Sequence, residues 1–211
     1  MDDFQNITSI SKADLALIVR DQFQSFGIEG MNYSICFSAK SDYFAETKAL
    51  AEPAVRFYTK PYLQPFTLEE TLEYADSALH LSPHASAAVA GWLHEKTLGH
   101  PYFLAFVCKH LSATVSRIEP RALEPTWPAI FDQLGREKFA LDVSQLSTKE
   151  LDLIHQFAIM GQSELAPHDF RGKFQREYFA RLAGKGFLIR AGRGRYTLYH
   201  PLFREFLRQT K

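Results

Sequence analysis

Hydrophobic and polar positions change their period twice along the chain, which divides it into three segments. In residues 1–64, apolar residues between Leu15 and Phe23 recur at helical spacing, and residues 31–37 are rich in β-forming side chains. Residues 54–58 are a second, shorter strand candidate. A helix followed by strands is typical of an α/β sheet, and this segment is long enough for only part of one.

Residues 65–142 carry the signals of a helical domain. A capping box, proline at first-turn positions and a stop at Gly99 predict three helices, which run from Thr67 to about Leu81, from Pro83 to about Leu98, and onward from Pro101. The prolines between Pro120 and Pro128 predict a loop, after which a fourth helix begins near Ile130.

Residues 143–211 alternate helices with a hairpin. A capping box at Ser147–Glu150 opens a helix, a short second helix follows Pro167, and a third runs from Gln175 to Ala183. Two strands joined through Gly192–Gly194 then precede a final helix from Pro201. This order is typical of a winged helix. The expected fold class is mainly α with an α/β remnant, in domains 1–64, 65–142 and 143–211.

Composition places the chain among globular proteins. Of the 211 residues, 46% are hydrophobic and 23% are charged, which excludes a mainly disordered chain. Cys36 and Cys108 lie too far apart in sequence for a disulfide framework. There is no apolar run of about 18 residues and no signal-peptide pattern at the start, so we expect a cytoplasmic protein without a membrane partner.

The net charge of zero conceals an uneven distribution. From His168 to Lys211 the chain has eleven Lys and Arg against three Asp and Glu, an excess of eight positive charges that residues 1–167 balance. A basic module on an acidic body indicates an anionic partner such as double-stranded DNA. It is equally consistent with a solvated surface, or with a basic face that docks on the acidic part.

Motifs of common enzymes are absent. The sequence has no G-x-x-x-x-G-K-[ST] loop, no C-x-x-C pair and no G-x-S-x-G. Gly192 and Gly194 lie between strands and lack the third glycine of a dinucleotide fingerprint. His80 and His84 are four residues apart, but Pro83 interrupts the helix that would align them. We therefore expect no hydrolase triad and no metal site from spacing.

Four sequence features occur in an informative order. They are the acidic pair Asp2-Asp3, the strand 33–37, the turn Gly99-His100-Pro101, and the run 196–207 that contains His200. In this order the chain resembles the C-terminal part of an AAA+/STAND-type P-loop ATPase, of the prokaryotic origin-recognition-like or NACHT-like switch ATPases. The resemblance covers nearly the whole chain and implies a partial P-loop ATPase sheet, a four-helix lid and a C-terminal winged helix.

The resemblance gives roles to residues of the first segment. Asp2 and Asp3 match the end of a Walker B strand, where the first acid helps to hold Mg²⁺ and the second helps to orient the attacking water; here they are vestigial. Ser38 and Lys40 follow the sensor strand and match residues near the γ-phosphate. Arg56 lies where related oligomeric ATPases carry an arginine finger. The alternatives are an acidic, disordered start and an ordinary strand-end loop.

The resemblance also points to a nucleotide sensor. Gly99-His100-Pro101 resembles the Gly-x-Pro motif of the lid, where a proline at a helix start packs near the adenine. His200 matches a histidine that contacts the β-phosphate of ADP, although its neighbours differ from the family pattern. The alternatives are a turn that only separates two core helices, and a histidine that only caps the last helix.

The winged helix offers a second site. In versions that bind DNA, the third helix enters the major groove and the wing contacts the backbone. The polar and basic side chains placed for this are Gln175, Arg176, Arg181, Lys185, Arg190, Arg193 and Arg195.

Three functions stay open from the sequence: a nucleotide-sensing switch region, a DNA-binding module, and a protein-interaction adaptor. Because the phosphate-binding loop is absent, we expect this chain alone to bind ATP poorly and not to hydrolyse it. ATP or ADP with Mg²⁺ belongs to a complete protein, in which an N-terminal P-loop half is the missing partner. We interpret the chain as a truncated frame or fragment, and an oligomer stays open.

Overall fold

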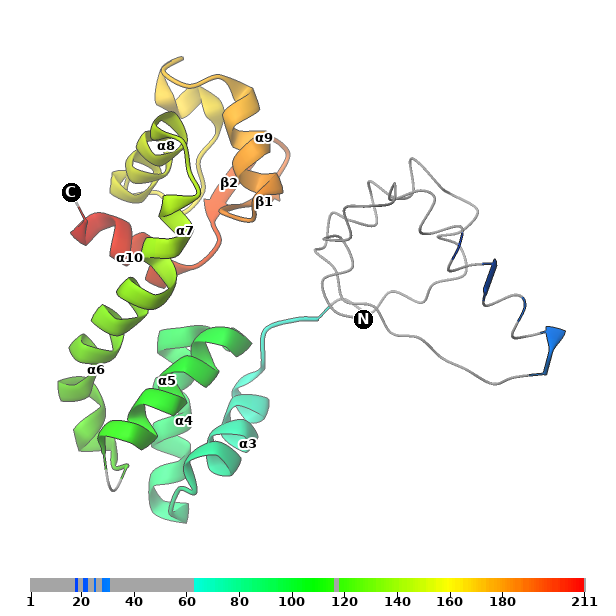
Figure 1. Cartoon of the computed structure of the whole chain (residues 1–211). Coiled ribbons are helices and arrows are strands. Elements are labelled where there is room, and N and C mark those ends of the chain that lie inside the picture. Colours follow the sequence, from blue (N-terminus) through cyan, green and yellow to red (C-terminus); the bar gives the residue numbers. More distant parts are fainter. Residues whose placement is uncertain are drawn as a thin grey trace. The chain divides into compact units, whose positions relative to one another are not determined.

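The computed structural model describes residues 63–115 and 118–210, together with a few positions between Ile18 and Gly30. The predicted strands of the first segment lie outside the described residues, as do Asp2, Asp3, Ser38, Lys40 and Arg56. Pro65–Lys211 is one compact unit. It is mainly helical with one two-stranded sheet, which confirms the mainly α class (Figure 1).

The three helices predicted between Thr67 and Thr114 are present, and they pack against one another. They are α3 (Leu68–Leu79), α4 (Pro83–Thr97) and α5 (Pro101–Thr114) (Figure 1). The Thr67 hydroxyl accepts from the Glu70 N–H, and the Glu70 carboxylate accepts from the Thr67 N–H at 2.8 Å, so the predicted capping box is present. Pro83 and Pro101 each occupy a first helical turn, where their missing N–H costs no helical hydrogen bond.

The predicted loop between Pro120 and Pro128 is wrong, because helix α6 (Pro120–Leu134) runs through it. Pro125 and Pro128 lie inside the helix on its exposed side, where water can bond the carbonyls they leave free. The opposite side is apolar and buried: Leu123, Trp127, Ile130, Phe131 and Leu134. Burying each of these side chains stabilises the fold by about 1.5–3 kcal/mol, which together outweighs a cost of about 3 kcal/mol per interior proline.

The helix continues beyond α6, which the sequence did not predict. A π-helical turn, η2 (Gly135–Phe139), leads into α7 (Ala140–Ser144), and Figure 1 shows one continuous ribbon from α6 to α7. The Phe139 ring lies 5.3 Å from Phe206 and 5.8 Å from Phe103. A Cβ on Gly135 would lie 3.3 Å from the Phe206 ring. The widened turn therefore lies where this helix meets the last helix of the chain.

The remaining elements follow the predicted order of helices and hairpin. They are α8 (Thr148–Ile159), the 3-10 turn η3 (Pro167–Phe170), α9 (Arg176–Gly184), the antiparallel strands β1 (Leu188–Gly192) and β2 (Arg195–Leu198), and α10 (Pro201–Gln209). The capping box of Ser147 and Glu150 is confirmed. Leu165 pairs with Tyr196 and so adds a short bridge to the hairpin. The predicted short helix after Pro167 is a single 3-10 turn.

One hydrophobic core runs through the unit. Phe103 of α5 stacks on Tyr199 at 6.4 Å, and Phe139 of η2 contacts Phe203 of α10 at 5.4 Å. Residues of the predicted domains 65–142 and 143–211 therefore share this core. Among the described residues, no helix is both long and apolar enough to cross a membrane.

Candidate functional site

Two histidine–proline steps begin two helices, and the structure brings them together. His100 is the N-cap of α5 and His200 is the N-cap of α10, each followed by proline at the first helical position. The two imidazole rings lie 5.7 Å apart, nearly perpendicular at 86°. The two parts of the predicted nucleotide sensor, which lie far apart in sequence, thus meet at the N-terminal ends of α5 and α10.

The turn before α5 needs a glycine. Leu98 and Gly99 both have left-handed backbones, with φ of 50° and 69°. A Cβ on Gly99 would lie 2.0 Å from the backbone oxygen of Phe66, and the Phe66 N–H donates to the Gly99 carbonyl at 2.8 Å. The Thr97 carbonyl closes the turn by accepting the His100 N–H at 2.9 Å. Conformation and close approach of the backbone thus both require glycine here.

The His200 side chain uses both ring nitrogens inside the protein. Its Nδ1 accepts the Leu202 N–H at 3.1 Å, and its Nε2 lies 2.9 Å from the Thr97 carbonyl oxygen. A carbonyl only accepts, so the ring is the neutral tautomer with its proton on Nε2. His200 therefore caps the last helix, as the alternative interpretation of the sequence holds. In this arrangement neither nitrogen is free for a phosphate oxygen.

Both histidines are neutral at physiological pH. Burial lowers the pKa of His200 to about 4, against the opposing effect of the hydrogen bond to Thr97, and His100 lowers it further. Burial also lowers the pKa of His100, and the nearby charge of Lys138 acts in the same direction. The partial positive charges at two helix N-termini disfavour an imidazolium as well.

His100 keeps an unused polar atom. Its Nδ1 is shielded from solvent and has no hydrogen-bond partner among the described residues. The ring packs on Phe103 at 4.7 Å. Next to it Tyr102 is 43% exposed, with the ammonium of Lys138 5.9 Å from its ring centre. The start of α5 thus combines N–H groups that no side chain caps, an aromatic face and a nearby cation.

A carboxylate holds that cation in place. The Lys138 ammonium lies 2.7 Å from Asp142 Oδ2, and the Tyr199 hydroxyl donates to the same oxygen at 3.1 Å. Burial, followed by the charge of Asp142, raises the pKa of Tyr199, so its hydroxyl stays protonated. The sequence analysis missed this trio. The i,i+4 spacing of Lys138 and Asp142 was a usable signal, but only the fold reveals Tyr199 beside them.

Two of the residues predicted to contact nucleic acid form ion pairs with a buried acid inside the protein. The Lys185 ammonium lies 3.0 Å from Glu150 Oε2, and the Arg181 Nε lies 3.8 Å from Glu150 Oε1. Glu150 is only 2% exposed. Burial opposes its ionisation, but hydrogen bonds from Ser147 and Lys185 outweigh this and hold the pKa of the carboxyl below its ordinary value. Arg181 and Lys185 therefore join α9 to α8.

The other predicted contact residues lie on the hairpin and at the start of α9. Arg195 pairs with Glu164 at 3.2 Å, which ties β2 to the preceding loop. Arg176, Arg190 and Arg193 are exposed, and none of them forms an ion pair within the part of the chain that the structure describes. Gln175 is exposed at the N-cap of α9 without a side-chain capping bond. Four of the seven predicted residues thus stay free for a partner.

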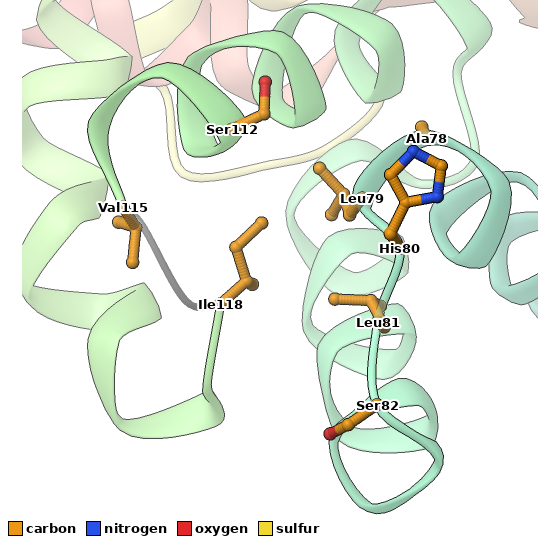
Figure 2. Close-up of a pocket in the computed structure, with 8 residues that line it drawn as sticks. All are labelled: Ala78, Leu79, His80, Leu81, Ser82, Ser112, Val115 and Ile118. Atoms are coloured by element: carbon orange, nitrogen blue, oxygen red, sulfur yellow. The ribbon is translucent and has the colours of Figure 1, made fainter.

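A cavity of about 280 Å³ lies elsewhere, between the α3–α4 connection and the end of α5. Figure 2 shows Leu79 and Ile118 pointing toward one another within it. Its other lining residues are small, apolar or hydroxyl-bearing apart from His80, and none is Asp, Glu, Lys or Arg. His80 is the one titratable side chain of this lining, and Ser82 and Ser112 bring the hydroxyl groups.

Metal and thiol chemistry have no support in the described residues. No group of three His, Cys, Asp or Glu side chains among them can hold a metal ion. Cys108 is buried, and burial raises the pKa of its thiol to about 12, so it is unreactive as a nucleophile.

No family model matches the chain, and neither a curated protein nor a solved structure matches it.

Proposed function

We propose that Pro65–Lys211 is the lid and winged-helix region of an AAA+/STAND-type P-loop ATPase and senses the bound nucleotide. The observation that supports this most is the meeting of Gly99-His100-Pro101 with His200 at the N-terminal ends of α5 and α10. The ligand is ATP or ADP with Mg²⁺. A P-loop half of the complete protein supplies the phosphate grip, and we expect the protein to act in the cytoplasm.

The chemistry at the start of α5 fits such a ligand. Uncapped N–H groups and the positive end of the helix dipole favour an anion. Lys138 lies close by, with its charge balanced by Asp142. The exposed Tyr102 ring is a stacking surface for a base. The Nδ1 of His100 has no partner but is shielded from solvent, so it can form a hydrogen bond with a polar ring edge only once the turn opens. These groups bind and orient; none of them activates water.

Binding of Mg-ADP to the full chain tests the proposal. We expect weak binding by calorimetry, with a Kd of about 1 mM, since only part of the site is supplied. We expect His100→Ala to weaken it about fivefold, and the exposed-surface control His168→Ala to leave it unchanged. Equal affinity for both variants, or stoichiometric ATP turnover by this chain, would contradict the proposal.

Double-stranded DNA binding is the second candidate. The observation that favours it is that Arg176, Arg190 and Arg193 are exposed on α9 and the hairpin and form no ion pair with another described residue. Backbone contacts by such arginines position a winged helix on a duplex. We expect Arg190→Ala with Arg193→Ala to weaken binding and lower the slope of log K against log salt by about 2, while Lys109→Ala leaves it unchanged. No binding at low salt would eliminate this candidate.

A protein-interaction adaptor is the remaining alternative. It predicts that both ligand tests fail in a chain that is still folded.

A further inference from the structure

One backbone carbonyl joins the two histidine–proline steps. The Thr97 oxygen accepts the His100 N–H at 2.9 Å and is 2.9 Å from the His200 Nε2. The first bond closes the turn that starts α5. The second bond joins Thr97 to His200, the N-cap of α10, which lies 103 residues later in the sequence. Both lone pairs of this carbonyl are therefore used, and the turn and α10 share it.

Capping alone does not explain a histidine at this place. An N-cap needs one acceptor for the N–H of the second or third helical residue, and Asn, Asp, Ser and Thr supply it best. His200 fills that need with Nδ1 and has Nε2 left over for Thr97. The ring is 4% exposed, so loss of either bond would leave a buried polar group unpaired.

The neighbouring residue strengthens the connection. Tyr199 bonds Asp142 on α7, while His200 bonds the end of α4. The Phe103 ring contacts both, at 6.4 Å from Tyr199 and 4.3 Å from His200. Displacement of the short connection between β2 and α10 therefore disturbs the turn before α5 through the bond to Thr97. It disturbs α5 itself through the two aromatic contacts of Phe103.

We propose that His200 is a latch that couples α10 to the Gly99–Pro101 turn through the Thr97 carbonyl. A rearrangement of the turn that moves the Thr97 carbonyl must break its bond to Nε2 of His200, and so must a shift of α10 that moves the ring. A change in the turn caused by a bound ligand is thereby transmitted to the winged segment. This inference goes beyond the proposed function, because the coupling lies within the chain and its test contains no nucleotide.

Two substitutions separate the cap from the latch. The amide of Asn ends where Nδ1 of histidine lies, so His200→Asn keeps the α10 cap and loses the bond to Thr97. The longer Gln reaches the position of Nε2, so His200→Gln keeps the donor to Thr97 and loses the cap. The readout is amide hydrogen exchange in the full chain, resolved by residue with NMR, and the control is His168→Asn.

We expect the Asn variant to speed amide exchange at His100 about five- to tenfold while the Leu202 amide keeps its rate. We expect the Gln variant to speed exchange at Leu202 by a similar factor while the His100 amide keeps its rate. Equal effects of the two variants on both amides, or no effect of Asn at His100, would overturn the latch. If the Asn variant unfolds, the position of the ring proton of His200 in the wild-type protein tests the proposal instead. A slowly exchanging Nε2 proton on a neutral His200 supports the latch, and a proton on Nδ1 overturns it.

Discussion

At the scale of single residues, backbone geometry explains Gly99 more firmly than any motif does. The residue combines a positive φ with a backbone oxygen in the place of a Cβ. The sequence could predict that a glycine ends α4, and that is confirmed. It could not predict the contact with Phe66, because nothing in local spacing shows which backbone passes over the turn.

Gly99→Ala tests this explanation. The added methyl cannot be accommodated without moving the Phe66 backbone, so we expect the free energy of unfolding to fall by about 2–4 kcal/mol. Gly161→Ala is the matched control, because a Cβ there meets no atom within 4 Å and φ is not positive. Urea denaturation measures both variants. A loss at position 99 no larger than at position 161 would contradict the packing of this turn.

His200 makes stability depend on pH in one direction. The unfolded chain protonates this residue near its ordinary pKa of 6.5, whereas in the folded protein burial lowers the pKa to about 4. The unfolded state therefore binds more protons between these values, and stability falls as pH decreases from 6.5 to 4. The full contribution is about 3 kcal/mol.

Urea denaturation at several pH values between 7 and 4 measures this slope. His200→Asn removes the titrating ring but leaves His100, so its curve should be flatter than that of the wild type over this range. Parallel curves would mean that His200 is accessible to protons in the folded protein.

At the scale of elements, the two capping boxes contribute unequally to the stability of the fold. Glu70 is exposed and only caps α3, whereas Glu150 is buried, caps α8 and pairs with Lys185 at the end of α9. Both boxes could be predicted from spacing. The burial of one could not, because it depends on how α9 packs against the start of α8. Local spacing also failed to predict the start of α6, because burial of its apolar side outweighs the cost of its interior prolines. It gave no indication of the π-helical turn η2.

The paired substitutions Glu70→Ala and Glu150→Ala measure this difference. We expect a loss of about 1 kcal/mol or less for Glu70, where solvent replaces the lost bonds. For Glu150 we expect a loss of about 3 kcal/mol, because Lys185 and the Ser147 N–H lose a buried partner. Thermal unfolding under one set of conditions compares them, and equal losses would show that Glu150 acts only as a cap.

At the scale of the whole molecule, the packing of the helices determines what local spacing leaves open. Periodicity predicted most of the helices and the hairpin of Pro65–Lys211, yet no local pattern indicated that the starts of α5 and α10 meet. Part of the basic excess at the C-terminal end is neutralised within the fold, since Arg181, Lys185 and Arg195 pair with Glu150 and Glu164. Charge counts cannot distinguish such pairs from a free surface.

The central claim is that the starts of α5 and α10 form one site that responds to nucleotide. A titration of the isotope-labelled full chain with Mg-ADP, up to about 10 mM, tests it most directly. We predict that the amides of residues 97–103 and 200–203, and the ring nitrogens of His100 and His200, shift together with a single midpoint. Resonances that stay fixed there, or that shift only on α9 and the hairpin, would contradict the claim.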